Sequence, residues 1–158
     1  MANPHQDPIA AVGITLLRIA LGLMFLAHSI VLKLFTFGLE GTAAFFVSLG
    51  LPAWTAYATF FAEAVGGAAI LLGIKARWFA LALSPILLGA LFTAHAGNGW
   101  VFSAPGGGWE YPAYLFLLSI GQFLLGDGAL ALAPSGPLQL PARAAIPRRF
   151  GRASAGLA

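Results

Sequence analysis

The sequence of 158 residues contains no cysteine and very few charged residues. The absence of cysteine excludes disulfide exchange, a thiolate nucleophile, cysteine-ligated iron–sulfur clusters and covalently attached c-type haem. Charged residues make up only 8% of the chain, whereas a soluble domain carries about 25%. With 59% hydrophobic residues and a mean hydropathy of +0.88, the composition is typical of a polytopic membrane domain. Any redox chemistry therefore needs an organic cofactor, a haem, or a metal held by histidine and carboxylates.

Motifs for nucleotide, metal and nucleic-acid binding are also missing. The Gly-rich stretch 98–109 lacks the Gly-Lys-Ser/Thr ending of a phosphate-binding loop and follows no predicted strand, so we expect no nucleotide cofactor. No HxxxH or ExxH spacing supports a metal site, and we expect none. A haem between His28 and His95 is chemically possible, but a single intramembrane histidine more often makes a hydrogen bond or moves a proton, so we do not expect a haem.

The basic character of the chain is concentrated near its end. Of the eight Lys and Arg residues, four lie in the last 16 positions. This pattern indicates a tail at a membrane surface and does not predict nucleic-acid binding.

The first long apolar run, Ile14 to Leu34, carries three basic side chains, Arg18, His28 and Lys33. An ionisable group in hydrocarbon costs about 2.5–3.5 kcal/mol or more unless it faces a partner or a wet cavity. At about 100° per residue, these three side chains share one broad helix face. They serve either as structural contacts between helices or as functional groups. Lys33 lies near the end of the run, where we expect its side chain to extend to the membrane surface.

The hydropathy pattern predicts an all-α fold, a membrane-embedded antiparallel four-helix bundle with short connections. The predicted helices cover about residues 9–35, 53–74, 78–95 and 111–132. The transmembrane domain would then span residues 9–134, after an N-terminal tail of residues 1–8. A short interfacial helix is expected at 45–52, and residues 135–158 are expected to form a mobile, basic cytoplasmic tail.

The four predicted spans place both termini and the turn Lys75–Arg77 on one side of the membrane. That side holds six of the eight Lys and Arg residues. The positive-inside rule therefore places both termini in the cytoplasm.

Polar residues of different helices are predicted to meet at two depths. Near the middle of the bundle, an ion pair between Arg18 and Glu63 is the simplest way to make both charges tolerable, either as a purely structural pair or as part of a functional site. Further polar residues lie toward the outer surface, and their helices all reach the same side: His28, His95, Asn98, Glu110 and Tyr111, with Gln122 on the face of Tyr111. The pattern predicts a pocket that opens outward, with Glu63 and Arg18 at its floor. Phe25 and Tyr111 could stack on a ring-shaped ligand, although aromatic residues also form belts at membrane interfaces.

The residues assembled above resemble the DoxX family of small bacterial four-helix membrane proteins. The resemblance runs from about Leu16 to Leu132. Its elements are Arg18…Gly22…Phe25…His28…Lys33-Leu34, Phe45-Phe46…Leu49-Gly50-Leu51-Pro52, Glu63…Gly66-Gly67…Leu72-Gly73, His95…Asn98-Gly99 and Glu110-Tyr111-Pro112. The position after His28 is commonly glycine in the family and is Ser29 here. The stretch 129–132 departs from the family pattern, so no function is carried onto it.

The resemblance implies a component of a membrane oxidoreductase in the bacterial cytoplasmic membrane. Some relatives are linked to thiosulfate oxidation with a quinone as acceptor, and others to oxidative-stress or thiol-handling complexes. Membership of such a family predicts the fold of a protein more dependably than it predicts the reaction.

Our leading hypothesis is a quinone-linked oxidoreductase component that works with a soluble or membrane redox partner. His28 and His95 would hydrogen-bond the ring oxygens and exchange protons, while Glu63 relays protons and Arg18 tunes its proton affinity. The expected cofactor-binding residues are Phe25, Asn98, Glu110, Tyr111 and Gln122. Two alternatives stay open: a protein that binds or transports a small solute through the same pocket, and a scaffold that recruits soluble partners. Each reading allows a homo-oligomer.

Overall fold

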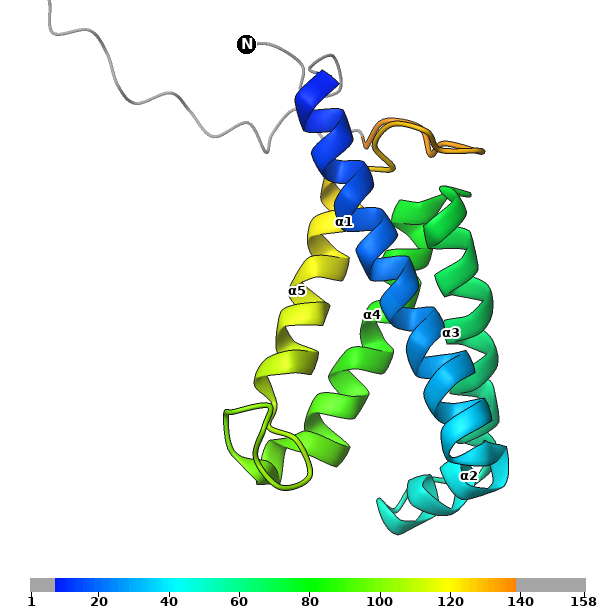
Figure 1. The fold of residues 1–158 in the computed structure, drawn as a ribbon, viewed down its shortest axis with the longest axis vertical. Helices are drawn as coiled ribbons and strands as arrows, with labels where there is room; N and C mark the ends of the chain where they lie inside the picture. The colour runs from blue at the N-terminus through cyan, green and yellow to red at the C-terminus, as the bar shows by residue number, and fades with distance from the viewer. Residues whose placement is uncertain (1–7, 139–158) are drawn as a thin grey trace, which may run out of the picture.

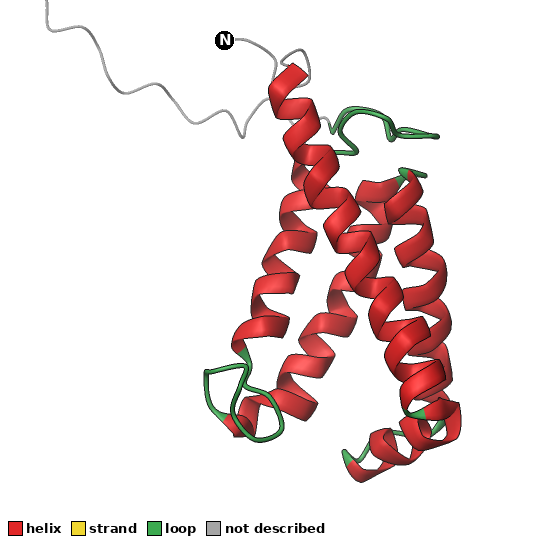
Figure 2. Cartoon of the chain, in the orientation of Figure 1, coloured by secondary structure: helices red, strands yellow, loops and turns green. Residues whose placement is uncertain are grey.

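The computed structural model describes residues 8–138, and the regular structure of this part is helical, without a strand (Figure 2). The helices in chain order are α1 (Pro8–Leu26), the π-helix η2 (Ala27–Thr36), α2 (Gly38–Ser48), α3 (Trp54–Leu72), α4 (Ala76–Ala90), the short π-helix η3 (Leu91–His95), the 3₁₀ turn η4 (Ala96–Asn98) and α5 (Glu110–Leu125). The all-α prediction is confirmed for this part of the chain. Most of the predicted N-terminal tail and of the basic tail lies outside the described residues.

Within residues 8–138, three helical stretches are long and apolar enough to cross a membrane: Pro8–Thr36, Trp54–Leu72 and Ala76–Asn98. The last helix, α5, was expected to continue to Leu132, but it ends at Leu125, and this prediction is wrong. Gly126, with φ +91°, stops the helix, and the 16 residues of α5 span about 24 Å. The expected interfacial helix at 45–52 is also displaced, since α2 covers Gly38–Ser48.

The long helices pack side by side around a common core (Figure 1). α1 contacts α3 and α5, and α4 contacts the same two helices. The buried core between them consists of apolar side chains, among them Leu21, Phe25, Ile70, Leu83 and Leu115. Large apolar side chains are also exposed on the outer faces of the long helices, which suits contact with lipid rather than with water.

α1 and α3 approach each other closely because glycine lies at their crossing. A Cβ atom at Gly22 would lie only 2.7 Å from the backbone nitrogen of Leu71, and one at Gly67 would lie 2.9 Å from the Cβ of Phe25. Small residues at such crossings let helix backbones come together in membranes, where packing drives helix association. The glycines therefore fix the distance between α1, which carries Arg18, and α3, which carries Glu63.

The two ends of the helix assembly are closed differently (Figure 1). At one end, the segment 126–134 runs beside the start of α1 and the junction of α3 and α4. There Ala129 N donates to Ala11 O (3.2 Å), and Lys75 N donates to Ala133 O (2.8 Å). At the opposite end, α2 lies against η2 and α3. Gly38 and Gly50 flank α2 with φ values of +71° and +81°, a conformation that glycine adopts without strain.

We predict that Gly22→Ala destabilises the protein, whereas Gly13→Ala does not. Both glycines belong to α1, but a Cβ at Gly13 meets nothing within 4 Å. The added methyl at position 22 pushes the α3 backbone away, while alanine at position 13 favours the helix by about 0.5–1 kcal/mol. The apparent melting temperature in a mild detergent measures both effects. Equal melting temperatures for the two variants would contradict the close crossing.

Candidate functional site

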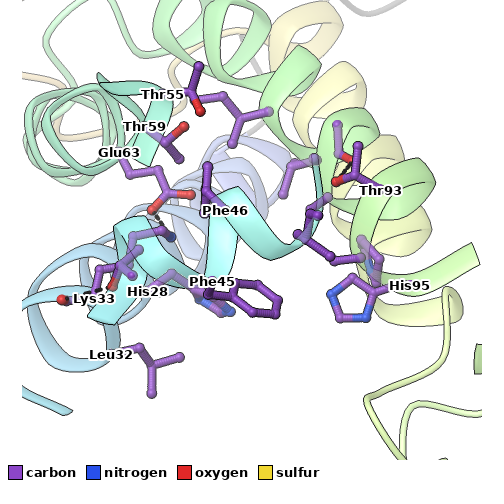
Figure 3. A pocket seen from close by; sticks show the side chains of 18 of the residues that line it. His28, Leu32, Lys33, Phe45, Phe46, Thr55, Thr59, Glu63, Thr93 and His95 are labelled. Carbon is purple, nitrogen blue, oxygen red and sulfur yellow. Dashed lines mark hydrogen bonds and ion pairs between the residues drawn. The ribbon is translucent and has the colours of Figure 1, made fainter. Parts of the chain in front are cut away.

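A cavity of about 710 Å³ lies at the α2 end of the molecule, between the long helices. Its walls are mostly apolar and come from every helical element except η4. Figure 3 shows the labelled polar side chains Lys33, Glu63, His28 and His95 around this space. A large apolar cavity with a few polar groups is the usual form of a small-molecule site.

The π-helix η2 determines which side chains of the first span reach the cavity. In a π-helix the hydrogen bond joins residues five apart, so residues at this spacing lie roughly above one another. His28 and Lys33 have this spacing, and both line the cavity. In an α-helix they would lie about 140° apart. Thr36 fits the wider turn, because its hydroxyl donates to Val31 O at 2.8 Å, also five residues earlier.

Lys33 forms an ion pair with Glu63 on the wall of the cavity. Lys33 Nζ lies 2.6 Å from Glu63 Oε2, and the two side chains are only 15% and 6% exposed. The predicted ion pair between Arg18 and Glu63 is therefore wrong, and Lys33 does not extend to the surface as expected. Removing one partner of such a buried pair leaves an uncompensated charge, which makes the pair a strong constraint on the positions of η2 and α3.

The two histidines are each fixed by one ring nitrogen. His28 Nδ1 lies 2.9 Å from Met24 O, one turn earlier in the same span. His95 Nδ1 lies 2.9 Å from Gly107 O, in the loop between η4 and α5. The His28 ring also stacks on the ring of Tyr111, with 6.1 Å between centroids, so α5 contributes to the same wall. Phe25 lies against the cavity and is fully buried.

Arg18 lies away from the cavity, at the opposite end of the molecule. Its side chain is 2% exposed, and Nη2 approaches Ala129 O (3.5 Å) and Leu130 O (3.4 Å). A Cβ at Gly73 would collide with Arg18 Nη1 at 1.7 Å, so the guanidinium packs over the end of α3. The expected place of Arg18 at the pocket floor is therefore wrong: the side chain anchors segment 126–134 and does not line the site.

Three further residues of the expected site do not line the cavity. Asn98 Nδ2 donates to Ala94 O, Gly106 O and Gly107 O at 2.9–3.0 Å, which builds the loop that holds His95. Glu110 accepts a hydrogen bond from Phe102 N at 2.7 Å and borders a separate hollow. Gln122 is buried near the end of α5, where Nε2 donates to Gly126 O at 2.6 Å.

Sequence reasoning missed the contribution of Lys33 and of α2 to the cavity. Phe45 and Phe46 of α2 line it, as does Thr42, whose hydroxyl donates to Lys33 O at 3.2 Å. The signal available for Lys33 was its position five residues after His28, the spacing of hydrogen-bonded residues in a π-helix. Within residues 8–138, no group of three or more His, Asp or Glu residues could hold a metal ion.

The described residues form a helical fold with stretches apolar enough to cross a membrane, and the cavity is its candidate site. The family model of DoxX matches residues 13–96, more than half of the chain, and the chain belongs to the DoxX family. A Bacillus subtilis (strain 168) protein named "Putative oxidoreductase CatD" is similar to it, with 34% identity over 123 residues that cover 78% of this chain and 86% of that protein. No solved structure matches the chain.

We predict that Lys33→Met and Glu63→Met are each more destabilising than the two changes combined. Each single variant leaves one buried charge without its partner, at a cost of roughly 3 kcal/mol, whereas the double variant removes both charges. A double-mutant cycle on apparent melting temperatures in detergent measures the coupling. The matched cycle of Arg18→Met with Glu63→Met should be additive, and coupling there instead of at Lys33 would contradict the observed pairing.

Proposed function

We propose that this protein is a quinone-linked component of a membrane oxidoreductase in the bacterial cytoplasmic membrane. Membership of the DoxX family, the relative named as an oxidoreductase and the three apolar spans support a redox protein of the membrane. The observation that carries the quinone assignment is the cavity of about 710 Å³, with apolar walls and a few fixed polar groups. A quinone has the matching chemistry, because it is an apolar ring with oxygens at its edge.

The residues of the cavity suit such a ligand in size and character. Ligand sites commonly have volumes of about 300–1,000 Å³ and bury most of the ligand. Apolar side chains such as Phe45 and Leu87 would cover the ring faces, and Tyr111 offers an aromatic surface beside His28. The polar groups at the wall would reach the ring oxygens.

A bound quinone supplies chemistry in which two electrons and two protons are taken up to give a quinol. The electrons come from a reduced partner protein or a diffusing reductant, because this chain has no thiol to relay them. His28 and His95 would hold or move protons at their Nε2 atoms, and Glu63 would relay protons to and from them. Lys33 takes the role that was expected of Arg18, since it is the cation paired with Glu63.

The proposal includes an antiparallel four-helix bundle with both termini in the cytoplasm. α5 would be the fourth span, and the start of α1, the junction of α3 and α4 and the segment 126–134 would then face the cytoplasm. Lys75 and Arg77 lie at this junction, which agrees with the positive-inside rule. The cavity would lie toward the outer face.

The absence of cysteine makes this topology testable with single introduced thiols. In spheroplasts, Ser103→Cys in the loop before α5 should react with a membrane-impermeant maleimide, and Lys75→Cys should react only after lysis. Both positions are exposed in the fold, so reactivity reports the side of the membrane. The cysteine-free parent chain gives the background. The reverse labelling pattern would overturn the proposed orientation.

We expect the protein purified in mild detergent to bind decylubiquinone and decylubiquinol, and Glu63→Gln to weaken binding of the quinol at least about fivefold, because a carboxylate acceptor is lost from the wall and Lys33 loses the partner that fixes it. Equilibrium dialysis or native mass spectrometry measures the bound quinone. The matched control is Glu40→Gln, an exposed carboxylate on α2 outside the cavity.

Two results would count against the quinone site. If folded protein binds no quinone, the assignment fails and transport of another small solute becomes the leading hypothesis. If Glu40→Gln weakens binding as much as Glu63→Gln does, the ligand does not occupy the cavity.

A further inference from the structure

We propose that the cavity binds the reduced, hydroxyl-bearing form of its ring ligand, a quinol, more tightly than the oxidised quinone. This inference rests on the proposed function, because it takes a quinone as the ligand class. It follows from the hydrogen bonds that the polar groups in the wall already make. In each group one atom is engaged by the protein, and the remaining atom determines whether the group can donate a hydrogen bond to a ligand or accept one from it.

His28 offers the cavity a hydrogen-bond acceptor. Its Nδ1 lies 2.9 Å from Met24 O, and a carbonyl oxygen only accepts, so Nδ1 carries the hydrogen. A neutral imidazole has one N–H group, and its other nitrogen therefore carries a lone pair. Because Nδ1 is engaged within the helix, Nε2 is the atom left for a ligand.

His95 is held in the same tautomer by an independent contact. Its Nδ1 donates to Gly107 O at 2.9 Å, which again leaves Nε2 as an acceptor. The position of that carbonyl is fixed by Asn98, whose amide donates to Gly107 O at 3.0 Å. Gly107 has φ +75°, so the loop takes a conformation that favours glycine. Two histidines on different helices thus present acceptors to one cavity.

Glu63 adds a third acceptor. Oε2 is engaged by Lys33 Nζ, while Oε1 makes no hydrogen bond to any residue in the range 8–138. In Figure 3 this second oxygen points away from Lys33, into the space between the labelled side chains. Lys33 is the one lysine or arginine at the cavity wall within the described part of the chain, and with one N–H group engaged by Glu63 it keeps two donors against these three acceptors. The Tyr111 hydroxyl can donate or accept and so favours neither form.

The balance of acceptors over donors selects between the two oxidation states. A quinol hydroxyl can donate to the Nε2 atoms or to Glu63 Oε1, whereas a quinone carbonyl has no hydrogen to give and would face a lone pair. Sites built to pair with a hydroxyl discriminate strongly against an analogue that lacks it. Tighter binding of the reduced form also shifts the bound couple toward reduction, which suits a site where a quinone accepts electrons.

The test compares decylubiquinol with decylubiquinone on the intact protein in mild detergent, at about pH 8, where an ordinary imidazole is neutral. Dithionite keeps the quinol reduced and leaves the protein unchanged, because the chain has no disulfide to lose. We expect the dissociation constant of the quinol to be about fivefold lower, as one or two hydrogen bonds would give. If both forms bind and the quinone binds as tightly or more tightly, the inference is wrong while the proposed function stands. If neither form binds, both are wrong.

The variants His28→Phe and His95→Phe show whether the histidines carry the preference. Phenylalanine keeps an aromatic ring but removes the acceptor, so each variant should weaken quinol binding by about threefold to fivefold and leave quinone binding within about twofold. A merely structural role would weaken the binding of both forms equally, and that result would contradict the assignment. The wild-type ratio decides the inference even if one variant fails to fold.

Discussion

The ion pair between Lys33 and Glu63 is the interaction on which the arrangement of this protein depends. A carboxylate in the middle of an apolar helix is expensive to bury, and its position is tolerable only where a cation and further polar groups reach it. The pair joins the first span to α3 at the level of the cavity. The close crossing at Gly22 brings the same two elements together deeper in the molecule, so one charged contact and one steric contact fix their relative position.

The remaining buried charged side chains of the described residues, Arg18, Arg77 and Asp127, lie at the end of the assembly opposite the cavity. Arg18 donates hydrogen bonds to backbone carbonyls of segment 126–134. Thr15 lies beside it, and its hydroxyl donates to Ala129 O at 2.8 Å. These contacts close that end of the assembly, where Nε and Nη1 of Arg18 are buried without a hydrogen-bond partner among the described residues. At the other end, Lys33, Glu63 and the histidines border the cavity. The polar cluster that closes one end and the polar cluster at the cavity are therefore separate, although both include residues of the first span.

The sequence was sufficient to predict the helices and the apolar spans, because hydropathy and helix-breaking residues are local signals. It was not sufficient to pair the charges. The wrong partner for Glu63 came from expecting Lys33, near the end of the apolar run, to extend to the membrane surface, whereas Lys33 of η2 forms an ion pair with Glu63 of α3. The same limit applies to Gln122 and Asn98. Periodicity placed Gln122 on a polar face but at the wrong depth for the cavity, and no local pattern reveals that Asn98 folds the loop behind His95.

In the proposed function, this chain is one component of a redox system that takes its electrons from another molecule. Without cysteine, no thiol in the chain can carry electrons, so the electron donor has to be brought by a partner or by a diffusing molecule. What the described residues do supply is a shaped apolar space, two imidazoles with their free nitrogens fixed, and a carboxylate held by a cation. In the proposed function, these groups position a ring and handle protons. Family membership accounts for the fold, but a reaction has to be argued from such groups. Their hydrogen-bonding atoms suit the proton transfers that accompany the reduction of a quinone.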